Sequence, residues 1–291
     1  MSNENLVRLA ELAKEVPGQP GKNAQALVQR MGEMIEGLGD KPIPWRAPTL
    51  KLVQSTSDRS KLPKGATIGS MVLGETVVAS PLRTIPIRLY TTRQMWNPDS
   101  DKATMVCSSP DGDTGFKYGS CKACPNAKFD EIEKRSACNK TITVVSVAED
   151  FSNVFFTNFS KTNYSNGLDW QGLMKKAGVS PFKRIYEISS GTSPKAKNVE
   201  ILKVEPVSGD NNVGDKLLPF VEELFRVVGE DRKSSLEGFY KYLETRASGD
   251  TAPGLVDHSH AAGDVDGEVV LISAEPAAGD TAAAAGAGYT L

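Results

Sequence analysis

The chain has 291 residues, of which 39% are hydrophobic and 24% are charged, and its formal net charge is -2. This composition is ordinary for a globular protein, and the length is sufficient for a buried core. No stretch approaches the ~18 consecutive apolar residues of a transmembrane helix, and no apolar signal segment is found. The sequence therefore predicts a cytoplasmic protein without a membrane partner.

Charge is divided unevenly along the chain. Seven of the 36 acidic residues and none of the 34 basic residues follow Arg246, so residues 1–246 carry a formal charge of +5 and residues 247–291 carry -7. A basic body attracts polyanions, and a flexible acidic tail can compete for the same surface or recruit a partner. The alternative is that the charge of the body is unremarkable and that the tail serves only solubility.

The N-terminal part predicts two helices. Apolar residues recur at helical spacing over residues 4–16 and 23–38, so residues 1–40 are expected to form a helical hairpin. This hairpin either packs on the body or serves as an oligomerisation handle. Residues 41–64 are expected to be a linker, because Pro42, Pro44 and Pro48 remove backbone donors and fix an extended path.

Residues 65–210 have the pattern of a β-rich domain. Runs of β-branched and aromatic residues predict strands over 84–90, 141–147, 154–159, 183–188 and 198–204, and a short helix over 167–177. Pro86 is expected at an edge or a bulge, and residues 95–98 are expected to end the first of these strands in a turn. The predicted class is α+β, built on an OB-like small β-barrel or a curved antiparallel sheet.

Helical periodicity returns towards the C-terminus. Residues 215–228 and 236–243 predict two helices, so residues 211–246 are expected to be helical. Residues 247–291 are rich in Ala, Gly, Asp and Ser and are expected to be a disordered acidic tail, with residues 269–272 as a candidate docking segment for a partner.

All four cysteines fall within one segment of 32 residues, which contains Cys107, Cys121, Cys124 and Cys138. The central C-x-x-C pair supplies two thiolates from one turn, and each arm of thirteen residues can return another sulfur to the same centre. This spacing predicts that the four cysteines hold one structural Zn²⁺ ion in a closed Cys₄ site within the loop 107–138. Two disulfides, a thioredoxin-type redox pair and coincidental free thiols are the alternatives.

Aromatic residues concentrate between residues 116 and 186, among lysines and arginines. Aromatic rings stack on unpaired bases while cations follow the phosphates, which holds single-stranded nucleic acid without reading its sequence. For any one ring, the alternative is burial in the core. The candidate nucleic-acid-binding residues are Phe155, Phe159, Lys161, Tyr164, Trp170, Lys175, Lys176, Lys183, Arg184 and Tyr186.

The sequence offers few catalytic residues. The two histidines, His258 and His260, lie in the predicted tail, so the parts of a Ser-His-Asp triad or of a histidine-liganded metal hydrolase are missing. Neither a G-x-x-x-x-G-K-[ST] loop nor a G-x-G-x-x-G motif before a helix is present. Asp111 and Asp113 lie in a glycine-rich turn, where an Asx-turn is expected in preference to a metal pair. We therefore expect a protein without enzymatic activity.

The cysteine block resembles a known family. The runs 107–112, 119–125 and 137–138, followed by strands and the segment 159–164, are similar to bacteriophage single-stranded DNA-binding proteins with a zinc-ribbon-like insertion. The resemblance covers about residues 65–205. It implies single-stranded DNA as the partner, in the bacterial host cytoplasm, and replication or recombination proteins as possible partners of the tail. The last residues, Tyr289, Thr290 and Leu291, depart from the acidic and aromatic tip of such tails.

These observations predict a protein that binds single-stranded DNA without sequence preference and protects it in phage replication or recombination. Two other functions stay open. The first is a zinc-containing transcription or replication accessory factor that binds a polymerase, and the second is a virion or assembly protein with a structural metal.

Overall fold

The structure is a computed structural model, which describes residues 3–36, 47–97, 104–128, 131, 136–194 and 196–247. The α-helices are α1 (Asn3–Glu15), α2 (Gly18–Glu36), α3 (Tyr164–Lys176) and α4 (Leu218–Ala247). Short 3-10 turns are η1 (Arg59–Lys61), η2 (Pro125–Ala127), η3 (Lys161–Asn163) and η4 (Pro181–Lys183). The strands are β1 (Thr49–Leu52), β2 (Met71–Leu73), β3 (Thr76–Val78), β4 (Leu82–Asn97), β5 (Thr104–Ser109), β6 (Thr114–Gly115), β7 (Gly119–Ser120), β8 (Cys138–Ala148), β9 (Val154–Ser160), β10 (Tyr186–Thr192) and β11 (Glu200–Pro206).

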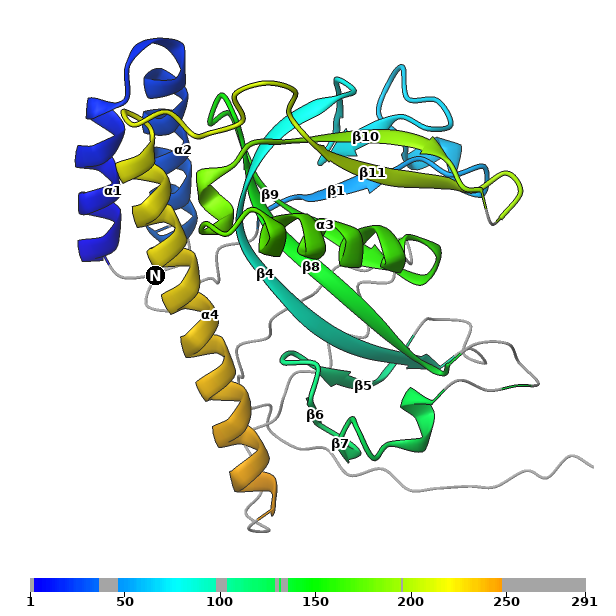
Figure 1. Cartoon of the computed structure of the whole chain (residues 1–291). Helices are drawn as coiled ribbons and strands as arrows, with labels where there is room; N and C mark the ends of the chain where they lie inside the picture. Colours follow the sequence, from blue (N-terminus) through cyan, green and yellow to red (C-terminus); the bar gives the residue numbers. More distant parts are fainter. Residues whose placement is uncertain are drawn as a thin grey trace, which may run out of the picture.

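In this part of the chain, nine strands form one strongly curled mixed sheet (Figure 1). The order is β11-β10-β4-β8-β9-β1-β2-β3, and β5 pairs with the C-terminal end of β4, over residues 93–97. Helices α1, α2 and α4 lie on one side of the sheet, whereas α3 lies within the curl (Figure 1). The expected α+β class with a curved sheet is confirmed, although the sheet is mixed because β1 runs parallel to β9.

Strand β8 separates two hydrophobic cores. Val145 and Val147 belong to the core that also contains residues of α1, α2 and α4, whereas Ile142 and Val144 belong to the core beneath α3. Successive side chains of a strand point to opposite faces. Both faces are therefore covered, and β8 is buried continuously from Ile142 to Ala148.

Strand β4 contains the expected irregularity at Pro86. Its register against β8 shifts between Pro86 and Arg88, so the predicted bulge is confirmed. The expected turn at residues 95–98 is wrong, because β4 continues to Asn97. Over residues 93–97 the strand pairs with β5, and as far as Met95 it also pairs with β8 on its other side.

Residues 41–64 are not a linker throughout. Strand β1 lies within this range and pairs antiparallel with β2 and parallel with β9. Phe156 N–H donates to the Pro48 carbonyl at 2.9 Å, directly before β1. Pro42 and Pro44 lie outside the described residues.

Helix α4 replaces the two C-terminal helices that were expected. It runs unbroken through Gly229, where a Cβ atom would overlap the Arg88 guanidinium. Arg88 Nε donates to the Phe225 carbonyl at 3.1 Å, and its guanidinium lies 3.5 Å from the Phe225 ring centroid. Gly229 therefore marks a close crossing of α4 and β4, and not a helix end.

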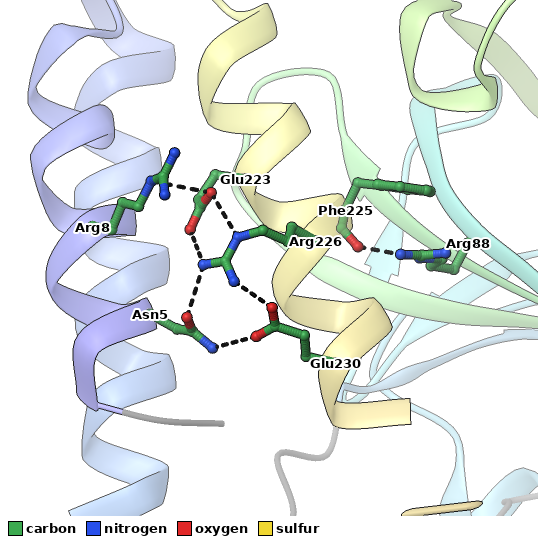
Figure 2. A network of polar contacts seen from close by, with 7 residues as sticks. All are labelled: Asn5, Arg8, Arg88, Glu223, Phe225, Arg226 and Glu230. Carbon is green, nitrogen blue, oxygen red and sulfur yellow. Dashed lines mark hydrogen bonds and ion pairs between the residues drawn. The ribbon is translucent and has the colours of Figure 1, made fainter. Parts of the chain in front are cut away.

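A polar network joins α4 to α1 (Figure 2). Arg226 donates to Glu223, Glu230 and Asn5, while Asn5 donates to Glu230 at 2.9 Å. Arg8 lies 3.3 Å from Glu223, whose side chain is only 4% exposed. The two predicted N-terminal helices are confirmed, and this network, together with the core beneath it, packs them on the body.

The remaining predicted elements are placed as follows. The hairpin expected around residues 183–204 is confirmed as β10 and β11, except that residues 183–185 precede its first strand. The helix expected over 167–177 is confirmed as α3. The predicted tail lies outside the described residues apart from Ala247, which ends α4. None of the helices in the described ranges is long and apolar enough to cross a membrane.

Candidate metal centre and nucleic-acid interface

Two of the four cysteines lie on strands of the main sheet. Cys107 on β5 and Cys138 at the start of β8 both pair in register with Met95 of β4, from opposite sides. Side chains of residues paired across neighbouring strands point to the same face. The thiols of Cys107 and Cys138 therefore lie on one face, on either side of Met95.

The other two cysteines, Cys121 and Cys124, follow β7 and lie at the same cavity as Cys107 and Cys138. Cys121 N–H donates to the Asp113 carbonyl at 2.7 Å, and the Cys124 carbonyl accepts from Ala127 N–H at 3.1 Å in η2. All four cysteines are free thiols that line one cavity, and each is only 7 to 9% exposed. The segment 107–138, called the cysteine module below, thus brings its four sulfurs to one cavity.

Gly115 on β6 allows the loop to approach the sulfurs. A Cβ atom at this position would lie 3.0 Å from Cys107 Sγ and 3.8 Å from Cys121 Sγ. The first distance is shorter than an ordinary carbon–sulfur contact, so a larger residue would push the sulfur of Cys107 aside. The absence of a side chain at Gly115 therefore helps to define the cavity.

The loop before β6 is held by a carboxylate. Asp111 Oδ1 accepts from Asp113 N–H at 2.9 Å, from Thr114 N–H at 2.8 Å and from Ser109 Oγ at 2.8 Å. The expected Asx-turn at Asp111 is confirmed. Despite the opposing effect of burial, these bonds and one from Tyr240 hold the pKa of Asp111 below its usual value.

Burial also changes the acidity of the cysteines. It raises the pKa of the Cys121 and Cys138 thiols, and the neighbouring cysteines raise it further, whereas the Arg93 guanidinium acts in the opposite direction. Arg93 lies on β4 beside the cavity, and its Nε donates to the Gly112 carbonyl at 3.1 Å. A cation at this position favours the thiolate, which is the form that binds a metal.

The four cysteines are the strongest zinc ligands among the residues that line this cavity. Four cysteine thiolates are the set that zinc takes in closed structural sites, so the residues fit this ion. In the described part of the chain, no three His, Cys, Asp or Glu side chains are arranged as a ready coordination shell. The cysteines line one cavity without forming such a shell, and zinc binding belongs to the proposal below.

Four of the candidate nucleic-acid-binding rings are in the core. Phe155, Phe159 and Trp170 are 0% exposed and Tyr186 is 2% exposed. Trp170 meets the edges of Phe159 and Tyr186 at centroid distances of 5.8 and 5.9 Å. The expectation that these rings stack on bases is therefore wrong for this fold, because their faces are used in packing α3 against β8, β9 and β10.

The other candidate residues do not form one patch. Lys161 and Tyr164 lie at the N-terminal end of α3, whereas Lys175 and Lys176 lie at its C-terminal end, about 18 Å along the helix axis. Beyond Lys176, Lys183 pairs with Glu222 at 3.9 Å and Arg184 donates to the Asn211 side chain at 2.7 Å. The predicted surface therefore separates into two groups at opposite ends of α3.

The first group gains a residue that the sequence did not single out. Lys140 Nζ lies 5.7 Å from the centre of the Tyr164 ring. Lys140 is exposed, and it lies two residues after Cys138, hence on the same face of β8 as that cysteine and Ile142. The spacing of two residues between Cys138 and Lys140 is the feature of the sequence that could have identified Lys140, because side chains two apart on a strand share a face.

A second pair of this kind lies on the cysteine module. Tyr118, between β6 and β7, is 43% exposed and lines the cysteine cavity, and Lys117 Nζ lies 5.5 Å from its ring centre. Accessible aromatic rings accompanied by lysines therefore occur both on the module and at the start of α3.

Comparison of the chain with protein-family profiles, curated protein sequences and solved structures gives no match.

Proposed function

We propose that the protein binds single-stranded DNA without reading its sequence, and that it protects single strands during replication or recombination. The observation that carries this proposal is the pair formed by Lys140 and Tyr164, a cation beside a partly exposed ring. Such a ring can stack on any base, and a neighbouring ammonium group can contact the phosphates. Lys161 lies three residues before Tyr164 and adds a further exposed cation.

The charge environment supports this assignment. Within the described residues, Lys117, Lys140 and Lys161 have no carboxylate at ion-pair distance, in contrast to Lys183 with its partner Glu222. Cations without a protein counter-ion are the ones that gain most from phosphates, because they release the counter-ions condensed on DNA. Lys175 and Lys176 at the end of α3 are likewise exposed and have no carboxylate at ion-pair distance among the described residues, so the Tyr164 ring beside Lys140 is what favours the start of the helix.

The strand order supports an OB-like barrel. When β5, β6 and β7, which lie between β4 and β8, are set aside, strands β4, β8, β9, β10 and β11 are consecutive in the chain. They lie in the order β11-β10-β4-β8-β9, and α3 lies between the third and the fourth of them. OB-folds are partly open five-stranded barrels that bind oligonucleotides on their second and third strands and on the loop between the first two. In this assignment the second strand carries Lys140, and that loop contains the cysteine module.

In this proposal Cys107, Cys121, Cys124 and Cys138 hold one Zn²⁺ ion as a structural site. Bound zinc contributes folding free energy, and four thiolates leave no position for a substrate. The role of the four residues is to fix the loop that carries Lys117 and Tyr118. The cysteine block also carries the resemblance to phage single-stranded DNA-binding proteins, which agrees with this role.

Fluorescence anisotropy with labelled oligo-dT and with a duplex of equal length tests the proposal. We expect tighter binding of the single strand, and an affinity that falls about 50-fold between 50 and 200 mM salt if four phosphates are neutralised. Equal or stronger binding of the duplex would contradict the proposal. A lack of binding to both probes at 50 mM salt would also contradict it, and would favour a polymerase-binding or assembly role.

A further inference from the structure

The two halves of α4 have different support. Within residues 218–228, five apolar side chains are buried in the core shared with α1 and α2, namely Phe220, Val221, Leu224, Val227 and Val228. Within residues 230–247, called the distal half below, none of the side chains that the structure describes is buried. The distal half therefore depends on other contacts for its position.

At its first residue, Glu230 accepts a hydrogen bond from Asn5 of α1. Beyond Glu230, the distal half runs beside β4 and the cysteine module and contacts both of them (Figure 1). The Arg232 guanidinium lies 4.3 Å from the centre of the Tyr90 ring and donates to the Pro110 carbonyl. The Tyr240 hydroxyl donates to Asp111 Oδ2. Two of these three contacts of Arg232 and Tyr240 thus end on adjacent residues of the loop between Cys107 and Cys121.

Asp111 can receive Tyr240 only while this loop is folded. Its other oxygen, Oδ1, is used by the three hydrogen bonds from within the loop. The loop has little other support, because β6 and β7 are two residues long and neither hydrophobic core includes a described residue between 104 and 128. A segment without a core of its own depends on a metal or a cross-link for its fold.

We propose that the cysteine module docks the distal half of α4 only while the module is folded around its metal, so that loss of the metal releases residues 230–247. Helices in proteins owe most of their stability to packing, so residues 230–247 should fray from the packed first half of α4 once their contacts are lost, and Gly238 lowers their helicity further. Because α4 ends directly before the seven acids that follow Arg246, docking also sets where the acidic chain begins relative to Lys117 and Lys122. This inference rests on the zinc site of the proposed function and not on DNA binding.

Hydrogen exchange measured by mass spectrometry on the full chain tests the inference. Samples are compared as purified and after chelation, and their metal content is determined in parallel. Amides of residues 230–247 should exchange about tenfold faster or more after metal removal, whereas residues 218–228 should keep their protection. Unchanged exchange in the distal half, or an equal increase in both halves, would overturn the inference. If the purified protein contains no metal, the zinc site is disproved and the inference with it, whatever the result of the DNA-binding experiment.

Three variants test the route of the coupling. Tyr240→Phe removes the bond to Asp111 without touching a cysteine, so it should speed exchange in the distal half while the zinc content stays unchanged. Tyr118→Phe is the matched control, because that hydroxyl has no hydrogen-bond partner among the described residues, and it should exchange like the wild type. Gly238→Ala, where the added Cβ atom would meet no side chain or neighbouring element within 4 Å, should retain more protection than the wild type after chelation. Wild-type exchange in Tyr240→Phe would exclude the route through Asp111.

Discussion

Gln54 closes the curl of the sheet onto Glu200. Gln54 Nε2 donates to the Glu200 carbonyl and Oε1 accepts from Glu200 N–H, both at 2.9 Å. The side-chain amide thus makes the pair of bonds that a facing residue makes in an antiparallel ladder. The end strand β11 is thereby joined to the segment that follows β1.

Replacement of Gln54 by Ala should therefore open this closure. It leaves the N–H and C=O groups of Glu200 without partners, so the free energy of unfolding should fall by about 1–3 kcal/mol in urea titrations. Ser55→Ala is the control, because among the described residues its exposed hydroxyl makes one hydrogen bond, of 3.3 Å to the Asn198 carbonyl, and its effect should stay within about 0.5 kcal/mol. Equal effects of the two variants would show that Gln54 does not close the sheet.

Two glycines of α3 should respond in opposite directions to substitution by Ala. At Gly167 a Cβ atom would lie 2.6 Å from Phe159 Cβ and 3.2 Å from Ile142 Cβ, so Gly167→Ala should cost about 1–3 kcal/mol. At Gly172 an added Cβ atom would meet no side chain or neighbouring element within 4 Å, so Gly172→Ala should stabilise the protein by up to about 1 kcal/mol. The midpoints of urea unfolding measure both. A stabilised Gly167→Ala variant would contradict the close packing of α3 on β8 and β9.

Zinc should copurify with the protein at about one ion per chain, because four thiols line one cavity. Cys121→Ser should lose the metal and lower the melting temperature, and chelation should do the same. Ser120→Ala, at the exposed neighbouring position, is the control and should leave both unchanged. Folded protein without metal, with four thiols that react in the native state, would exclude the zinc site.

Truncation after Arg246 should strengthen DNA binding at low salt. The formal charge changes from -2 to +5, and at ~10 mM salt, where the Debye length is ~30 Å, acidic residues can compete with phosphates for the lysines. A full-length chain with its seven tail acids replaced by Asn or Gln is the control for charge, and it should bind like the truncated chain. Equal affinities of full-length and truncated protein at low salt would leave the tail a role in partner docking through residues 269–272 or in solubility.

The elements with strong local patterns could be predicted from the sequence. Strands β8 and β9 follow from β-branched and aromatic runs, and the bulge at Pro86 follows from its missing N–H group. Strand β1 could not be predicted, because the prolines before it indicate a linker and because its four residues are held in the sheet by pairing with β2 and β9. The continuity of α4 could not be predicted, because a glycine at position 229 is typical of a helix end. Its lack of a side chain instead leaves room for the Arg88 guanidinium.

At the candidate site, too, features that depend on local sequence could be predicted, and features that depend on contacts between distant segments could not. The convergence of the cysteines depends on short-range spacing, so it could be predicted. Whether Trp170 or Tyr164 faces solvent depends on how α3 lies in the curl, and a buried ring and a stacking ring have the same chemistry. The pairing of Lys140 with Tyr164 joins β8 to α3, which only the three-dimensional fold brings together.

The central claim is that single-stranded DNA crosses the surface at the start of α3. Two double variants remove the same charge from opposite ends of this helix, Lys140→Gln with Lys161→Gln and Lys175→Gln with Lys176→Gln. By oligo-dT anisotropy over a salt series, the first should lower the affinity about tenfold and reduce the salt slope by about 1.4, whereas the second should change the affinity less than about twofold. Equal losses in the two variants, or a larger loss from Lys175 and Lys176, would contradict the account.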